Sequence, residues 1–331
     1  MKRRNFIVHL GGTAAAWPLA VRAQQPAVPV VGFLHGSNAQ GDAGAVAGIK
    51  EGLKEAGFIE GKNVALEYRW AEKHFDRLPA LAAELISRKP AVIIVGGGSA
   101  SAVATKALTS TIPIVLAFGS DPVELGLAPR LDHLGGNVTG VIFPGQHAAE
   151  RVKLLSQFAP QAITIAYLRT GPQFSNAVTE EQTAAVAAAA KAQGRQLLVL
   201  KADSRSDIDA GFATLLAQKA GALDIAAHPF FDDYETIGHL AKLTLQHKIP
   251  SIFIQRAFPA AGGLMSFGES YAEGFRHAGG LVGKILKGEK AGNLSFDQST
   301  KVELIINDKT AKTLGLTIPQ SLLSRASEVI E

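Results

Sequence analysis

Short apolar runs alternate with helix-forming segments along nearly the whole chain, and this alternation limits the possible folds more than any other feature. The apolar runs lie at 28–34, 91–95, 113–118, 163–168, 223–227 and 251–254. Amphipathic or alanine-rich segments stand between them, among them 46–56, 75–88 and 174–193. Strands that alternate with helices form parallel sheets that helices cover on both faces. The sequence therefore predicts an α/β protein.

The alternation runs through two successive series. The first ends with a strand at 137–141, and a second begins with a helix at 148–158 and closes with a helix near 321–329. A chain of 331 residues has the length of about two domains. The join near Phe143 is short and contains no Pro/Ser-rich linker. We therefore expect two hinged lobes, each with a parallel sheet.

Residues 1–23 have the pattern of an export signal. Three cations at positions 2–4 precede a weakly apolar stretch, which ends in the small-residue sequence Ala-Val-Arg-Ala at 20–23. The pair Arg3 and Arg4 resembles a twin-arginine signal, and an ordinary secretory signal is the alternative. We expect cleavage near Ala23 and a periplasmic protein.

The charge of the chain argues against binding to nucleic acid. The formal net charge is +4, from 33 cations and 29 acids. Residues 1–23 hold four cations and no acid, so the rest of the chain has 33 − 4 = 29 cations against 29 acids. A neutral chain lacks the basic surface that a phosphate backbone requires. The absence of cysteine also excludes disulfides, thiolate metal sites and a lipid-modified cysteine anchor.

Ligands of open α/β sheets bind beyond the carboxyl ends of the strands, so the loops there supply the candidate contacts. In the first series these are Ser37, Asn38, Gly98, Ser99, Ala100, Ser120 and Asp121. Backbone N–H groups at a helix start after Gly98 suit a carboxylate, although the glycines also suit a packed turn. Asp121 suits a ligand ammonium, or the cap of a short helix.

The second series contributes Thr170, Gly171, Gln173, Phe230, Phe231 and Arg256 as candidates. The two phenylalanines follow a strand, where they either cover an apolar ligand face or pack in the core. Arg256 stands where we expect the chain to cross between the lobes, and it either binds a carboxylate or braces the hinge.

No catalytic or cofactor motif stands out. The chain has no Gly-x-Ser-x-Gly elbow and no His-Glu-x-x-His sequence. The glycines at 96–98 do not match a phosphate-binding loop or a dinucleotide fingerprint. His228 and Asp232 are too few to indicate a metal site. We expect no cofactor, no metal and no enzymatic activity.

Several segments together resemble one protein family. They are 31–34 (VGFL), 48–57 (GIKEGLKEAG), 60–64 (EGKNV), 67–72 (EYRWAE), 76–79 (DRLP), 111–118, 121–123 (DPV), 135–140 (GGNVTG), 207–210, 229–231 (PFF), 261–268 (AGGLMSFG) and 314–319 (LGLTIP). These motifs cover essentially the whole chain after the export signal. The chain resembles the ABC-transporter substrate-binding proteins of the tryptophan/tyrosine-type importers.

The resemblance implies a type I periplasmic binding protein. Such proteins have two Rossmann-like lobes joined by three crossovers, and they trap a ligand in the cleft between the lobes. We therefore assign residues 27–143 plus about 257–290 to lobe 1, and 144–256 plus about 291–331 to lobe 2. The family also implies a monomer that docks on an ABC permease in the membrane.

We expect capture of a small ligand, either an amino acid or an aromatic or amphipathic carboxylate. Ser37, Ser99 and the amides after Gly98 would hold its carboxylate, Asp121 its ammonium, and the Phe230–Phe231 pair its apolar part. Two other functions stay open on the sequence alone. The same fold serves as a sensor that presents its closed form to a receptor, or as an exported α/β enzyme.

Overall fold

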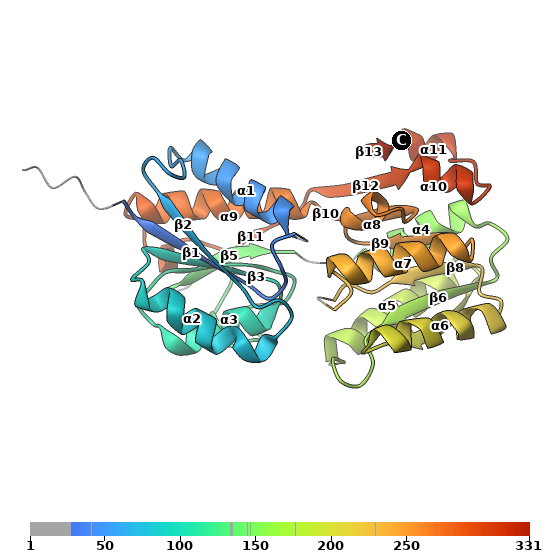
Figure 1. Ribbon diagram of the computed structural model, residues 1–331, viewed down its shortest axis with the longest axis horizontal. Helices are drawn as coiled ribbons and strands as arrows, with labels where there is room; N and C mark the ends of the chain where they lie inside the picture. Colours follow the sequence, from blue (N-terminus) through green and yellow to red (C-terminus); the bar gives the residue numbers. More distant parts are fainter. Residues whose placement is uncertain are drawn as a thin grey trace, which may run out of the picture.

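The computed structural model describes residues 28–40, 42–132, 135–143, 145, 147–175, 177–228 and 230–331. The predicted export signal lies outside these residues. Two lobes stand side by side, each with one sheet between helices (Figure 1). The predicted α/β class with two lobes and parallel sheets is confirmed.

Lobe 1 contains a six-stranded sheet in the order β11-β5-β4-β3-β1-β2, with every pair parallel. The strands are β1 (Val30–His35), β2 (Ala65–Trp70), β3 (Val92–Gly96), β4 (Ile114–Phe118), β5 (Val138–Ile142) and β11 (Asp297–Gln298). Alternate residues of β1 enter different cores, since Phe33 belongs to the cluster on one face and Leu34 to the cluster on the other. Burial on both faces explains why these strands are apolar runs rather than alternating ones.

Helices α1 (Ala43–Glu55) and α9 (Tyr271–Leu286) pack together on one face of this sheet, and α2 (Leu78–Ser87) and α3 (Ser99–Leu108) pack together on the other. The short η1 (Phe75–Arg77) leads into α2, and η2 (Ala291–Asn293) lies beside β5. Figure 1 shows α9, in the colour of the late sequence, lying beside the blue α1. The chain thus returns to lobe 1 after building most of lobe 2.

Lobe 2 contains a seven-stranded sheet in the order β13-β12-β10-β9-β8-β6-β7. The strands are β6 (Thr164–Arg169), β7 (Gln196–Lys201), β8 (Ala222–Ile225), β9 (Ser251–Phe253), β10 (Met265–Glu269), β12 (Val302–Asn307) and β13 (Glu328–Ile330). Its helices are α4 (Ala148–Phe158), α5 (Ala177–Ala192), α6 (Arg205–Ala217), α7 (Tyr234–Gln246), α8 (Ala257–Ala260), α10 (Asp308–Thr313) and α11 (Gln320–Leu323). Among these described strands, only the β10–β12 pair is antiparallel.

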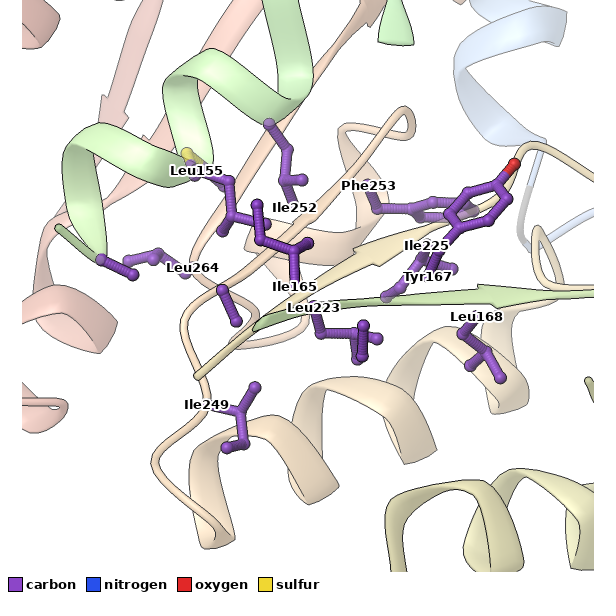
Figure 2. Close-up of a cluster of buried hydrophobic side chains, with 14 of the residues drawn as sticks. Leu155, Ile165, Tyr167, Leu168, Leu223, Ile225, Ile249, Ile252, Phe253 and Leu264 are labelled. Carbon is purple, nitrogen blue, oxygen red and sulfur yellow. The ribbon is translucent and has the colours of Figure 1, made fainter. Parts of the chain in front are cut away.

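The core of lobe 2 is one continuous apolar cluster. Figure 2 shows part of it, where Tyr167, Ile225 and Phe253 come from three neighbouring strands. One ion pair is buried here, between Arg151 of α4 and Asp224 of β8 (Nε–Oδ1 2.9 Å). Burial raises the pKa of Asp224, Arg151 opposes that rise, and the pair satisfies two charges that the core would otherwise exclude.

The chain crosses between the lobes three times, after β5, after β10 and after β11. The last two crossings differ from the sequence-based boundaries near 257 and 290. Strand β10 pairs with β9 and β12, so residues 257–269 belong to lobe 2, and β11 pairs with β5, so residues 291–298 belong to lobe 1. Which sheet a strand joins depends on its pairing partner, and the hydrophobic pattern of the strand does not indicate that partner.

Hydrogen bonds tie the three crossings to one another. Glu269, the last residue of β10, accepts from the Gly145 N–H (2.6 Å) and from His147 Nε2 (2.9 Å) on the first crossing. These bonds hold the pKa of Glu269 below its usual value against the effect of burial. The Ser270 N–H donates to the Lys301 carbonyl (2.8 Å). The crossings therefore form one narrow hinge.

The end of the chain also differs from the prediction. A helix over 321–329 was expected, but α11 stops at Leu323 and residues 328–330 form β13, which pairs with β12. Pairing with an existing sheet edge provides backbone hydrogen bonds that a short isolated helix cannot match.

Candidate functional site

Side chains from both lobes meet where the strands end. Lys73 follows β2 and places its Nζ 2.6 Å from Oδ2 of Asp233, which follows β8 in the other lobe. Asn38 follows β1 and donates from Nδ2 to Oδ1 of Asp233 (3.3 Å). The carboxyl ends of the two sheets therefore face each other, at the position where open α/β sheets bind ligands.

The lobe 1 side of this junction is a polar network on the loop after β1. Oδ2 of Asp42 lies 3.1 Å from Nδ1 of His35 and accepts from the Ser37 hydroxyl (2.6 Å). The Ser37 oxygen in turn accepts from the Asn38 N–H (2.6 Å). His35 and Ser37 are buried, so this network anchors the loop to buried residues of lobe 1. Trp70 lies beside the His35 ring, with centroids 5.4 Å apart.

The lobe 2 side presents two consecutive carboxylates. Asp233 is buried and caps α7, accepting from the Thr236 N–H (2.8 Å). Its neighbour Asp232 is partly exposed as a residue, but its Oδ1 is inaccessible to solvent and has no hydrogen-bond partner among the described residues. Burial and the nearby Asp42 raise the pKa of Asp232 to about 8, against a hydrogen bond from Gln255.

Tyr271 belongs to the lobe 1 side of the junction. It begins α9 directly after the second crossing. Burial raises the pKa of its hydroxyl well above the usual value, and the charges of Asp42 and Asp232 add to the rise. A hydrogen bond with the Gly97 backbone opposes it. Tyr271 therefore ties the start of α9 to the glycine-rich loop that follows β3.

That loop holds three predicted contacts, Gly98, Ser99 and Ala100. Gly98 is the N-cap of α3 with φ 104°, and Ser99 and Ala100 begin the helix without a side-chain cap. Gly97 has φ 70°, and a Cβ there would lie 2.5 Å from the Gly36 nitrogen. The packed-turn interpretation therefore holds for Gly97, while the helix start remains a candidate carboxylate site.

Ser120 and Asp121 follow β4, as predicted. Oδ1 of Asp121 accepts from the Val123 N–H (2.7 Å). The side chain therefore holds a turn over 122–126, and the short helix that it was expected to cap does not form. Asp121 forms no ion pair within the described ranges, and the carboxylate that contacts the other lobe is Asp233 instead.

Thr170, Gly171 and Gln173 lie on the loop after β6. Asp203, which follows β7, accepts from the Gly171 N–H (2.7 Å) and from the Gln173 N–H (3.0 Å). Thr170 is buried, and its carbonyl accepts from Arg169 (3.2 Å). The backbone of this loop is thus held within lobe 2.

The two predicted phenylalanines have different environments. Phe231 has no exposed surface and belongs to the lobe 2 core, so the core-packing interpretation is the correct one for it. Phe230 is half-buried and stacks on Phe174 with centroids 5.9 Å apart. His228 adjoins both Phe174 and the Phe230 N–H, and burial lowers its pKa to about 4. Phe230, Phe174 and neutral His228 therefore form an aromatic surface on lobe 2.

The prediction for Arg256 is wrong in its placement. Arg256 lies before α8 within lobe 2, about a dozen residues before the crossing at β10. Its guanidinium pairs with Glu328 (Nη2–Oε1 2.6 Å) near β13. The partner is a residue of the last strand, 72 positions away, which no local pattern could indicate.

Five side chains at the junction were not proposed from the sequence as ligand contacts: Asp42, Lys73, Asp232, Asp233 and Tyr271. Asp233 had a detectable signal, because it follows a predicted strand and precedes a helix. Tyr271 had no local signal, because its helix follows the second series in sequence, although the family resemblance placed that helix in lobe 1, where it packs on α1.

Among the described residues, no helix is both long and apolar enough to cross a membrane. The part of the chain that the structure describes also holds no group of three or more His, Asp or Glu side chains placed to bind a metal ion.

A family model described as ABC transporter substrate binding protein matches residues 29–330. A curated relative, the tyrosine-binding protein of Clostridioides difficile (strain R20291), is 23% identical over 273 residues, which are 82% of this chain and 76% of the relative. The match spans both lobes and all three crossings.

Solved structures share the fold. A conserved domain protein from Vibrio cholerae superposes with a TM-score of 0.78 at 25% identity, over 91% of this chain and 99% of that one. An ABC domain from Streptococcus pneumoniae in complex with L-Trp gives 0.77 at 23% identity, with the same coverage. The ligand-free, open structure of an adhesive substrate-binding protein from Clostridium difficile gives 0.67 at 23%, over 92% and 99%.

Proposed function

Since the chain belongs to the family of ABC transporter substrate-binding proteins, we propose that it captures an amino acid between its lobes and delivers it to a membrane permease. The observation that supports this most directly is the meeting of polar side chains from both lobes at the carboxyl ends of the strands. Two of the relatives are named for, or were crystallised with, tyrosine and tryptophan. The export signal proposed for residues 1–23 agrees with a periplasmic binding component.

The site supplies groups for each part of such a ligand. The amides at the start of α3 offer donors to its carboxylate, whereas the Ser37 hydroxyl donates to Asp42 and the Asn38 amide to Asp233. Phe230 and Phe174 offer an aromatic surface to its side chain. Closure of the lobes about the hinge would bring these groups together around the ligand. A ligand bound at micromolar Kd requires about −8 kcal/mol, which one charged contact and the burial of a ring can supply.

Isothermal titration calorimetry with L-tyrosine, L-tryptophan, L-phenylalanine and aliphatic amino acids tests this proposal. The protein is first unfolded, dialysed and refolded so that co-purified ligand is removed. We expect saturable binding of one ligand per chain, a smaller radius of gyration in X-ray scattering with ligand, and recovery of the ligand unchanged by mass spectrometry. Absence of binding across the panel contradicts capture of an amino acid, and conversion of the ligand to a product indicates an enzyme.

A further inference from the structure

The amino ends of four neighbouring strands of lobe 2 carry cations and no acid. The connections that enter β6, β7, β8 and β9 are residues 159–163, 193–195, 218–221 and 247–250. These strands are consecutive in the sheet, so the connections lie side by side. They contain Arg195, Lys219 and Lys248, and Lys191 stands in the last turn of α5. Neither the connections nor the last turns of the helices before them contain Asp or Glu. Although the chain after residue 23 is neutral overall, this cationic end of lobe 2 concentrates positive charge.

The charges of this cationic end are not neutralised within the protein. None of the four cations forms an ion pair with an acidic side chain in the described part of the chain. Lys191, Lys219 and Lys248 are exposed. Arg195 donates to the carbonyls of Pro160 and Ala162, so it fixes the connection that enters β6. The three ammonium groups are therefore available to an anionic partner.

Two of these lysines occupy a backbone conformation that favours glycine. Lys219 follows α6 with φ 54°, and Lys248 follows α7 with φ 53°. Gly194 takes the equivalent position after α5 with φ 65°. Glycine adopts this conformation without strain, whereas a side chain is disfavoured there. Glycine at either position would therefore remove the charge without straining the backbone.

An apolar side chain projects into solvent among these cations. Ile163 is 70% exposed. It borders a groove of about 520 Å³, together with Phe158, Lys219, Pro250 and Leu316, and no Asp or Glu lines this groove. The dipoles of the helices favour cations at their carboxyl ends. They do not explain an exposed isoleucine in the same place, and apolar exposure beside charge is typical of an interaction surface.

We propose that the cationic end of lobe 2 binds the anionic lipid surface of a membrane. Lipid headgroups provide phosphates for the cations, and the acyl layer beneath them accepts Ile163. A nucleic acid offers phosphates but no apolar layer. The chain has no cysteine that could carry a lipid anchor, so this surface holds the protein near a membrane permease without one. The interlobe junction lies at the opposite ends of the strands and stays free for a ligand.

Co-sedimentation of the processed chain with lipid vesicles tests this proposal. One set of vesicles is pure phosphatidylcholine, which is neutral, and the other also contains phosphatidylglycerol, which is anionic. We expect binding to the anionic vesicles at low salt and its loss at high salt, because salt screens exposed charges. We expect no binding to the neutral vesicles.

The variant Lys219→Gly with Lys248→Gly removes two charges. It should lower the partition coefficient about 25-fold, since each cation near an anionic surface contributes about fivefold. Its melting temperature should be equal to that of the wild type or higher, because glycine suits the left-handed backbone. Ile163→Ser should lower the partition coefficient about tenfold, through the loss of apolar burial.

Lobe 1 provides matched controls for both changes. Lys62 and Lys287 are exposed, and Ile59 is 41% exposed. The double variant Lys62→Gln with Lys287→Gln and the single variant Ile59→Ser should each bind anionic vesicles as the wild type does.

Three results would overturn the proposal: equal binding to neutral and anionic vesicles, binding to neither, or anionic binding that the double glycine variant and Ile163→Ser retain in full. Binding to immobilised poly-glutamate without binding to vesicles would indicate an acidic protein as the occupant, and it too would overturn the proposal. The vesicle experiment contains no amino acid, so its outcome is independent of whether the protein captures one.

Discussion

Replacing Gly279 by alanine tests the close packing of α1 on α9, which joins the first part of lobe 1 to its late-sequence helix. A Cβ at Gly279 would lie 2.5 Å from the Ile49 carbonyl oxygen and 3.1 Å from the Leu53 nitrogen. Both obstructing atoms are backbone atoms of α1, so no side-chain rotation relieves the clash. Ordinary contact begins at 3.4 Å, and the helices must therefore separate locally by 3.4 − 2.5 = 0.9 Å.

The magnitude follows from two opposed effects. Overpacking of this kind destabilises by about 1–3 kcal/mol, and the rigid obstruction favours the upper end. Alanine in a helix interior recovers about 1 kcal/mol relative to glycine. We expect a net loss of about 2 kcal/mol, which lowers the melting temperature of a lobe this size by about 4–8 °C.

Gly280 provides a control on the same helix. Nothing lies within 4 Å of a Cβ at this position, and its φ is not in the left-handed region. Gly280→Ala should therefore stabilise lobe 1 by up to about 1 kcal/mol, through helix propensity alone. Two identical substitutions at adjacent positions are thus expected to act in opposite directions.

Trp70 reports the unfolding of lobe 1, because it packs edge-on against Phe33 there, with centroids 5.2 Å apart. The other tryptophan, Trp17, falls in the predicted export signal. Thermal and urea melts followed by tryptophan fluorescence of the processed chain therefore isolate this lobe. Equal melting temperatures for G279A and the wild type, or equal losses in G279A and G280A, would refute the close approach of α1 and α9.

Two further predictions concern ion pairs. Lys73→Met removes the cross-lobe bridge to Asp233, a partly exposed pair worth at most about 1 kcal/mol. The ligand-free protein should then open, which X-ray scattering detects as a larger radius of gyration. The Kd of the ligand should rise up to about fivefold. An unchanged radius and Kd would show that the bridge does not bias closure. Arg151→Met leaves the buried Asp224 carboxylate without its partner. It should reduce the unfolding free energy of lobe 2 by about 3–5 kcal/mol in urea titrations. The double variant Arg151→Met with Asp224→Leu should recover most of that loss. Failure of both expectations would mean that water reaches the ion pair.

The candidate site was predictable in its location and less so in its members. The end of each predicted strand indicates where a loop begins, so the loops holding Ser37, Asn38 and Phe230 could be selected from the sequence. The environment of each side chain could not be predicted from the sequence. Phe230 and Phe231 are neighbours with the same chemistry, yet one is half-buried beside Phe174 and the other has no exposed surface. Alternation along the chain determines such a difference only after the sheet and its helices are in place.

The sequence by itself determined the class of fold, because parallel strands buried on both faces require long apolar runs and intervening helices. It also carried the family resemblance over the whole chain. Only the tertiary structure decided which sheet received β10 and β11, that residues 328–330 add a strand, and that Lys73 of one lobe contacts Asp233 of the other. These outcomes depend on pairs of residues that are distant in sequence, and a local pattern holds no information about a partner far along the chain.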